Sequence, residues 1–179
     1  SQGLANVAWA FARLRVEDAS FFRALAVAST QKIGDFLPQE LASLAVAYAG
    51  SGFCEEELCR AISEQVAAKR GACSDQHLSN FAWAFVTLSV DGTGIFDVLA
   101  DEIVARPVGF TPQGLCCIAW AFATRAPASP LGGACSDDRP VFRRVALDAV
   151  PKVKDFTPRS LSGLAWAFAK AAVEDDVLF

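Results

Sequence analysis

The chain has 179 residues, of which 53% are hydrophobic and 20% are charged, and its formal net charge is −4. Its longest strictly apolar run is the nine residues from Leu115 to Ala123. A helix that crosses a bilayer needs about 20 apolar residues, so we expect no membrane span. The sequence has a single histidine and no clustered acid–base pair, so we expect no catalytic residue, no cofactor and no enzymatic activity.

One short apolar segment recurs five times at a nearly constant interval. Its copies begin at leucines separated by 37, 37, 37 and 46 residues, namely Leu4, Leu41, Leu78, Leu115 and Leu161. A period between about 20 and 50 residues is typical of solenoids, in which each repeat buries its apolar face against its neighbours. We therefore expect one array of repeats over 1–37, 38–74, 75–111, 112–157 and a partial 158–179. Since the array begins and ends within a repeat and contains no methionine, we expect a fragment of a longer protein.

Each repeat opens with a helix-start signal, which predicts a first helix, here called the A helix. Thr111-Pro112 and Thr157-Pro158 place threonine at the N-cap and proline at the first helical position, and Ser74 offers an equivalent cap. The A helices are predicted at 2–15, 39–52, 76–89, 113–126 and 159–172, ending near Arg15, Gly50 to Gly52, Ser89, Ala126 and Ala172.

A second helix, the B helix, is predicted in each complete repeat because apolar residues recur there in matching columns. One column contains Phe21, Leu58, Ile95 and Val141, and another contains Leu25, Ile62, Leu99 and Val145. The paired helices predict an all-α, right-handed α-solenoid of stacked helical hairpins, with about four and a half repeats. We expect its core to bury Leu4, Phe11, Phe85, Phe122 and Phe168.

A basic residue is expected in the last turn of each B helix, at Lys32, Lys69, Arg106 and Lys152. Positive charge at a helix C-terminus compensates the helix dipole. These residues recur about one helix spacing apart. The four residues either serve only to compensate the helix dipoles or form a ladder that contacts the phosphates of RNA.

The longer interval in the fourth repeat places nine extra residues between its A and B helices, around 127–136. Two prolines and two glycines in this insertion predict a loop. The loop is either a tolerated surface excursion or a contact for a partner.

The six cysteines include no C-x-x-C pair, so we expect no zinc or other metal site. Cys59 and Cys73 occupy columns that hold phenylalanine in other repeats. We interpret them as small core residues in a reducing compartment.

One polar face remains on the otherwise apolar A helix when residues are placed at about 100° each. In the first repeat it contains Gln2, Asn6 and Arg13, opposite Leu4 and Phe11. Across the repeats this face, here called the A stripe, consists of Gln2, Asn6, Arg13, Gln39, Ser43, Gln76, Asn80, Thr87, Gln113, Thr124, Arg159 and Lys170. Variable polar side chains on a fixed frame are typical of repeat proteins that read one base per repeat. The alternative is a face that only meets water.

A tryptophan lies beside the A stripe in four repeats, at Trp9, Trp83, Trp120 and Trp166. These indoles could stack on RNA bases or pack between adjacent A helices. The predicted A helices carry five arginines and lysines but only one acid, Glu40. That balance favours an anionic ligand, whereas the acidic chain as a whole is poorly suited to neutralising phosphates.

The 37-residue period, the Phe-Thr-Pro-Gln-x-Leu start and the Leu-x-Asn-x-Ala-Trp-Ala-Phe-Ala core, seen in residues 4–12 and 78–85, resemble known repeats. The similar families are the heptatricopeptide and octotricopeptide repeats of algae, dinoflagellates and apicomplexan parasites. The resemblance implies a nucleus-encoded protein imported into a mitochondrion or plastid. It also implies binding of single-stranded organellar RNA in processing, stability or translation, or a place in an organellar ribosome. A RAP domain often follows such repeats, but none is visible here.

These features predict an organellar RNA-associated repeat protein, bound to single-stranded RNA or within a ribonucleoprotein. The alternative is a structural scaffold that binds protein subunits of an organellar assembly. The net charge of −4 favours the scaffold, as do the apolar residues Val46, Cys117 and Gly163 where a reader should be polar.

Overall fold

The computed structural model describes residues 1–90, 93–107, 109–125 and 138–173, which contain helices and no strand. The all-α prediction is therefore confirmed for this part of the chain. The chain divides into two compact units, Ser1–Val98 and Leu99–Phe179, and helix α6 (Ile95–Ala105) spans the division. None of the helices in the described ranges is long and apolar enough to cross a bilayer. The predicted loop at 127–136 lies outside the described residues.

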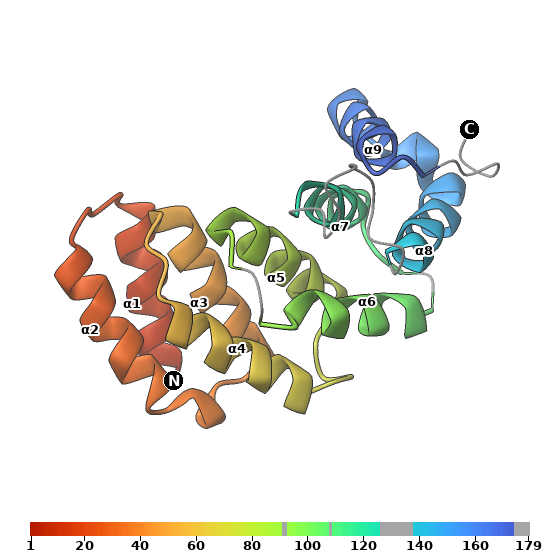
Figure 1. Cartoon of the computed structure of the whole chain (residues 1–179). Coiled ribbons are helices and arrows are strands. Elements are labelled where there is room, and N and C mark those ends of the chain that lie inside the picture. Colours follow the sequence, from red (N-terminus) through yellow and green to blue (C-terminus); the bar gives the residue numbers. More distant parts are fainter. Residues whose placement is uncertain (91–92, 108, 126–137, 174–179) are drawn as a thin grey trace. The chain divides into compact units, whose positions relative to one another are not determined.

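Unit 1 is built from two layers of helices (Figure 1). The A helices α1 (Gln2–Arg13), α3 (Pro38–Ser51) and α5 (Asp75–Leu88) form one layer, in which α1 packs against α3 and α3 against α5. The B helices α2 (Ala19–Thr30) and α4 (Glu56–Ala68) pack against each other in the second layer. A short 3-10 turn, Ile33–Asp35, leads from α2 into α3.

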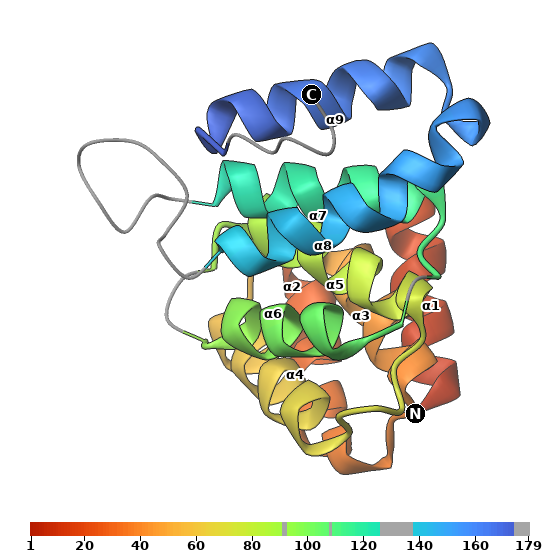
Figure 2. The same ribbon diagram turned by 90° about the vertical axis from the view of Figure 1, so that its right-hand side faces the viewer.

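Unit 2 repeats this arrangement with α7 (Pro112–Thr124), α8 (Arg139–Ala149) and α9 (Pro158–Lys170). The A helix α9 lies along the A helix α7, and α8 covers α7 from the other layer (Figure 2). A 3-10 segment, Val150–Asp155, connects α8 to α9. Within each unit, every A helix therefore packs on the A helix of the next repeat.

The predicted caps begin three of the A helices. The Oγ1 atoms of Thr111 and Thr157 each accept the amide three residues on, at 3.1 and 3.2 Å. Ser74 Oγ accepts the amide of His77 at 3.3 Å, and His77 Nδ1 accepts the amide of Ser74 at 3.1 Å. The histidine thus completes a capping box, with its ring in the place of the usual glutamate.

Replacing Thr111 with alanine should lower the free energy of unfolding by about 1 kcal/mol. The variant lacks the hydroxyl oxygen that accepts a hydrogen bond from the Gly114 N–H in the first turn of α7. Urea unfolding followed by circular dichroism measures this change. The matched control is Thr111→Ser, which keeps the accepting oxygen and should retain most of the stability. An equal loss in both variants would contradict the capping role.

The A helices end within two residues of the predicted positions, through one recurring geometry. The residue in the same column after four of the A helices is left-handed, with φ of 53° at Arg15, 76° at Gly52, 53° at Ser89 and 51° at Ala172. This conformation disfavours a side chain by roughly 1 kcal/mol. Among these four described positions, only Gly52 in the second repeat avoids that strain.

Three of the five residues expected in the core are fully buried. Phe85, Phe122 and Phe168 are at most 2% exposed, as predicted. The prediction was wrong for Leu4 and Phe11, which are only half-buried. Both lie on α1, which contacts one A-layer helix, α3, whereas α3 contacts two.

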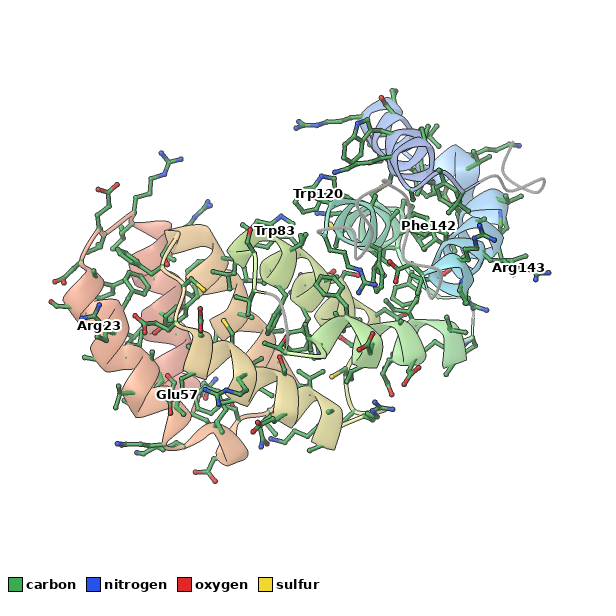
Figure 3. The ribbon with its side chains drawn as sticks, in the orientation of Figure 1. Arg23, Glu57, Trp83, Trp120, Phe142 and Arg143 are labelled. Atoms are coloured by element: carbon green, nitrogen blue, oxygen red, sulfur yellow. The ribbon has the colours of Figure 1, made fainter. Side chains whose placement is uncertain are left out.

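The same aromatic contact joins consecutive repeats in both units. In unit 1 the ring of Phe22 on α2 meets that of Tyr48 on α3 edge to face, with centroids 5.5 Å apart. In unit 2, Phe142 on α8 points toward α9 and meets Phe168 edge to face at 5.2 Å (Figure 3). Each pair is separated by 26 residues. The B helix of one repeat therefore packs an aromatic ring on the next A helix.

Candidate nucleic-acid interface on the A helices

The A stripe of the first repeat lies on the solvent-exposed face of α1. Gln2, Asn6, Trp9 and Arg13 are all exposed, and Trp9 is exposed by 53%. Their spacing of four, three and four residues keeps them on one face over about 16 Å of helix. This helix therefore presents two side-chain amides, an indole and a guanidinium in one line.

The other predicted stripe residues lie mostly on the surface as well. Gln39, Gln76, Thr87, Gln113, Arg159 and Lys170 are exposed, whereas Ser43, Asn80 and Thr124 are half-buried. The hydroxyl oxygen of Thr124 is buried and has no hydrogen-bond partner. The first column is exposed in every repeat and is thus better placed for a ligand than Thr124; it consists of Gln2, Gln39, Gln76, Gln113 and Arg159.

Three stripe side chains already form hydrogen bonds on α5. Gln76 Nε2 donates to Asn80 Oδ1 at 2.9 Å, which links two neighbouring stripe positions. Thr87 Oγ1 donates to the backbone oxygen of Trp83 at 2.7 Å. The Gln76–Asn80 bond aligns both amide groups while each keeps further donors or acceptors for a ligand.

The tryptophans lie on the outer side of the A layer and are not enclosed in the core. Trp166 is 47% exposed, similar to Trp9, and Trp83 and Trp120 are half-buried. Figure 3 shows Trp83 on the side of α5 that faces away from α4. On α9, the ammonium of Lys170 lies 5.0 Å from the centre of the Trp166 ring, within the range of a cation–π interaction.

Four of the five cations in the predicted A-helix ranges are exposed, and Glu40, the one acid in those ranges, is engaged. The structure adds a second acid, Asp75, as the first residue of α5. Arg13, Arg15, Arg159 and Lys170 are exposed. Glu40 accepts the amide of Leu37 at 2.8 Å and a hydrogen bond from Ser1 at 3.2 Å. The Glu40 carboxylate therefore caps α3. A fifth cation, Arg125, forms an ion pair with Asp138 at 2.7 Å.

The sequence predicted the basic column in the last turns of the B helices. In the structure these residues lie just beyond the helix ends. Lys69 directly follows α4, Arg106 directly follows α6, and Lys32 and Lys152 lie two and three residues past α2 and α8. Lys69 Nζ donates to the backbone oxygens of Gly34 and Phe36 at 3.0 and 2.7 Å and to Gln65 Oε1 at 3.0 Å. A lysine has three donors, so these three bonds leave no Lys69 N–H for a phosphate.

Lys152 makes the equivalent contact in unit 2. Its ammonium donates to the backbone oxygen of Phe110 at 2.7 Å and to Asp148 Oδ1 at 2.5 Å. Asp148 is fully buried, and its Oδ2 accepts the amides of Gly109 and Phe110 at 3.2 and 2.9 Å. Phe36 and Phe110 occupy the same column, so in the second and fourth repeats this cation ties the repeat to the turn that precedes it.

Sequence reasoning missed the acceptors that hold this column. They lie four residues before the cation, at Gln65, Glu102 and Asp148, and Arg106 is 3.4 Å from Glu102. One signal was present in the sequence: the position four residues before the cation is polar or acidic in three repeats. The contact across 33 or more residues to the preceding turn carries no local signature.

The described cysteines have mixed surroundings. Cys59 and Cys73 are buried, as predicted, Cys54 is exposed, and Cys116 and Cys117 are half-buried. Burial raises the pKa of the Cys59 thiol to about 12 and that of Cys116 to about 11, so both are protonated at neutral pH. Among the described residues, no three histidine, cysteine or acidic side chains are grouped as a metal site requires.

Comparisons with known proteins add nothing to this geometry. No protein-family model matches the chain, and no curated protein is significantly similar to it.

Proposed function

We propose that this chain is an RNA-associated helical-repeat protein that lays single-stranded RNA along the A stripe. In this proposal the repeats continue through both units as a right-handed solenoid of about four and a half hairpins. The A helices then present their stripes side by side. The packing of consecutive A helices within each unit supports such an arrangement.

One observation carries the proposal: an exposed indole lies beside an exposed cation at the same repeat position in both units. The pairs are Trp9 with Arg13 on α1 and Trp166 with Lys170 on α9. An indole offers a stacking surface to any base, and a neighbouring cation can neutralise the phosphate that follows.

The amide columns would supply the variable contacts. Gln39, Gln76 and Gln113 are exposed at equivalent positions, and Asn80 is hydrogen-bonded to Gln76. Amides can donate to and accept from base edges and ribose hydroxyls. We assign base or sugar contacts to these residues and to Arg159, and stacking to Trp83 and Trp120.

A mitochondrial or plastid location is part of the proposal and rests on the resemblance to the heptatricopeptide and octotricopeptide repeats. So do roles in RNA processing, stability, translation or ribosome assembly. We assign no enzymatic activity and no cofactor to the chain.

Binding of a labelled single-stranded RNA pool, measured over a series of salt concentrations, tests the proposal. Lys170→Ala should lower the slope of log affinity against log salt by about 0.7, the value for one single-strand phosphate contact. The matched control is Lys154→Ala, which removes an equally exposed lysine outside the A helices and should leave the slope unchanged. Equal slopes for the two variants would count against the A stripe.

The stacking and amide contacts have their own variants. Trp166→Ala should weaken binding by about 1 to 3 kcal/mol, as the loss of one stacked base does. A combined Gln76, Asn80 and Gln113 alanine variant should also bind more weakly. Gln31→Ala, which changes an exposed glutamine outside the A helices, is the control. Salt-insensitive binding, or full binding by the combined variant, would refute the proposal.

The competing role is that of a scaffold for protein subunits, and it is favoured by Val46, Cys117 and Gly163. All three are half-buried on the A helices and offer no polar side chain for reading a base, apart from a weak thiol. A scaffold would remain in its protein complex after nuclease treatment. Release by nuclease would instead support the RNA role.

A further inference from the structure

The B helix of the fourth repeat exposes a row of side chains that we call the α8 outer face. It consists of Arg139, Arg143, Leu147 and Val150, which recur every three or four residues and so lie on one side of the helix. All four are exposed, Leu147 by 47% and Val150 by 37%. Figure 3 shows Arg143 on the side of α8 that faces away from α7.

Neighbouring repeats leave this position of the B helices open. The residues equivalent to Arg143 and Leu147 are exposed in every repeat, namely Arg23, Arg60 and Asp97 in the first column and Val27, Glu64 and Asp101 in the second. They include residues of α4 and α6, which have repeats both before and after them in the chain. Exposure of the α8 outer face therefore does not depend on which repeats adjoin it.

The α8 outer face is basic and partly apolar. Within the described part of the chain, neither of its arginines has an ion-pair or hydrogen-bond partner. The one acid inside α8, Asp148, is buried and bound to Lys152. Arginine beside exposed aliphatic side chains is a composition that protein interfaces favour, and its charge requires an acidic partner.

The same columns of α6 have the opposite charge. They contain Asp97, Asp101 and Val104, here called the α6 outer face, and all three are exposed, Val104 by 42%. On both helices two like charges stand four residues apart, and an exposed apolar residue follows about one turn later. The α8 and α6 outer faces therefore match in spacing and are opposite in sign.

The outer faces of the other two B helices do not offer this match. On α4, Arg60 lies between Glu56 and Glu64, so the face has both signs of charge. On α2, the equivalent charged residue is Arg23, which has the same sign as the arginines of α8. Among the described B helices, α6 is thus the one whose outer face is acidic and contains no cation.

We propose that copies of this chain associate by docking the α8 outer face of one copy on the α6 outer face of another. When the two helices lie side by side in the same direction, both arginines meet aspartates and the aliphatic side chains meet about one turn later. Charge complementarity makes the pairing specific, and burial of the aliphatic side chains adds to its stability. Two turns on each helix bury little area, so the complex should be weak and reversible. The A stripe takes no part in it.

Sedimentation velocity of the whole 179-residue chain, free of nucleic acid, tests the proposal over about a thousandfold range of protein concentration up to about 1 mM. The average mass should rise with concentration above the 19.0 kDa of one copy. Raising the salt concentration from about 0.05 to 0.5 M should weaken the association, because salt screens the facing charges.

Reversing one charge on either face gives the decisive comparison. Arg143→Glu and Asp97→Arg each place like charges opposite one another, so the concentration needed for association should rise at least about tenfold in each variant alone. An equal mixture of the two variants should associate as the unchanged chain does, because each reversed face then meets a face of opposite charge. Recovery in the mixture also excludes misfolding as the cause of the loss.

The matched control is Arg60→Glu, which makes the same charge change in the same column of α4 and should leave the association unchanged. Far-ultraviolet circular dichroism checks that the variants are folded. A monomer at every concentration, full association by either reversed variant alone, or a mixture that stays monomeric would each overturn the proposal. Monomers that pellet with anionic phospholipid vesicles would instead identify a lipid surface as the occupant of the α8 outer face.

Discussion

Replacing Asp148 with alanine is expected to lower the free energy of unfolding of unit 2 by about 3 to 5 kcal/mol. The Asp148 side chain is fully buried and accepts hydrogen bonds from Lys152 and from two backbone amides. Alanine would leave both amides without this acceptor and remove the carboxylate that balances the Lys152 ammonium. Urea unfolding of unit 2, followed by circular dichroism, measures the loss.

Two further variants separate the buried network from simple loss of charge. Asp155→Ala removes an exposed acid from the same segment and should change stability by no more than about 0.5 kcal/mol. The double variant Asp148→Ala/Lys152→Met should lose less than the sum of the single losses, because the two side chains act on each other. A loss no larger than that of Asp155→Ala would show that the buried carboxylate contributes little.

Replacing Phe122 with alanine should destabilise unit 2 by a similar amount, about 3 to 5 kcal/mol, as large truncations in a core do. Its side chain is 2% exposed, so the change leaves a cavity that the surrounding helices can only partly fill. Chemical unfolding monitored by tryptophan fluorescence reports the difference.

The matched control for this cavity is Phe11→Ala, because Phe11 occupies the same column in the first repeat. Phe11 is half-buried and its ring stacks on Phe21 at 4.0 Å, so its removal should destabilise unit 1 by less. Equal losses at the two positions would mean that burial within the A layer does not govern this column.

The sequence predicted helix type and helix ends well because those features depend on nearby residues. Thr111, Thr157 and Ser74 cap their helices as predicted, since a cap needs only an oxygen within three residues. The left-handed residues at Arg15 and Ala172 could not be predicted, because neither is the glycine that usually marks that geometry.

Burial and side-chain partners were harder to predict because they depend on which neighbours are present. Phe11 and Phe122 have the same repeat position and differ only in what packs around them. For the A stripe, the wheel correctly placed Gln39 and Gln76 on the surface, but it could not show that the Thr124 hydroxyl is buried. The roles of these residues stay predictions.

The hydrogen bonds of Lys69 determine how local opening can spread between repeats. The lysine belongs to the second repeat, whereas Gly34 and Phe36, whose carbonyls it binds, belong to the turn that closes the first. If α4 frays, that turn loses its donors, so the two repeats should open together as one cooperative segment. In a nearest-neighbour description of a repeat array, these bonds contribute to the coupling between repeats and not to the stability of either one alone. Substitutions in this column would therefore change the length of chain that opens in a single step.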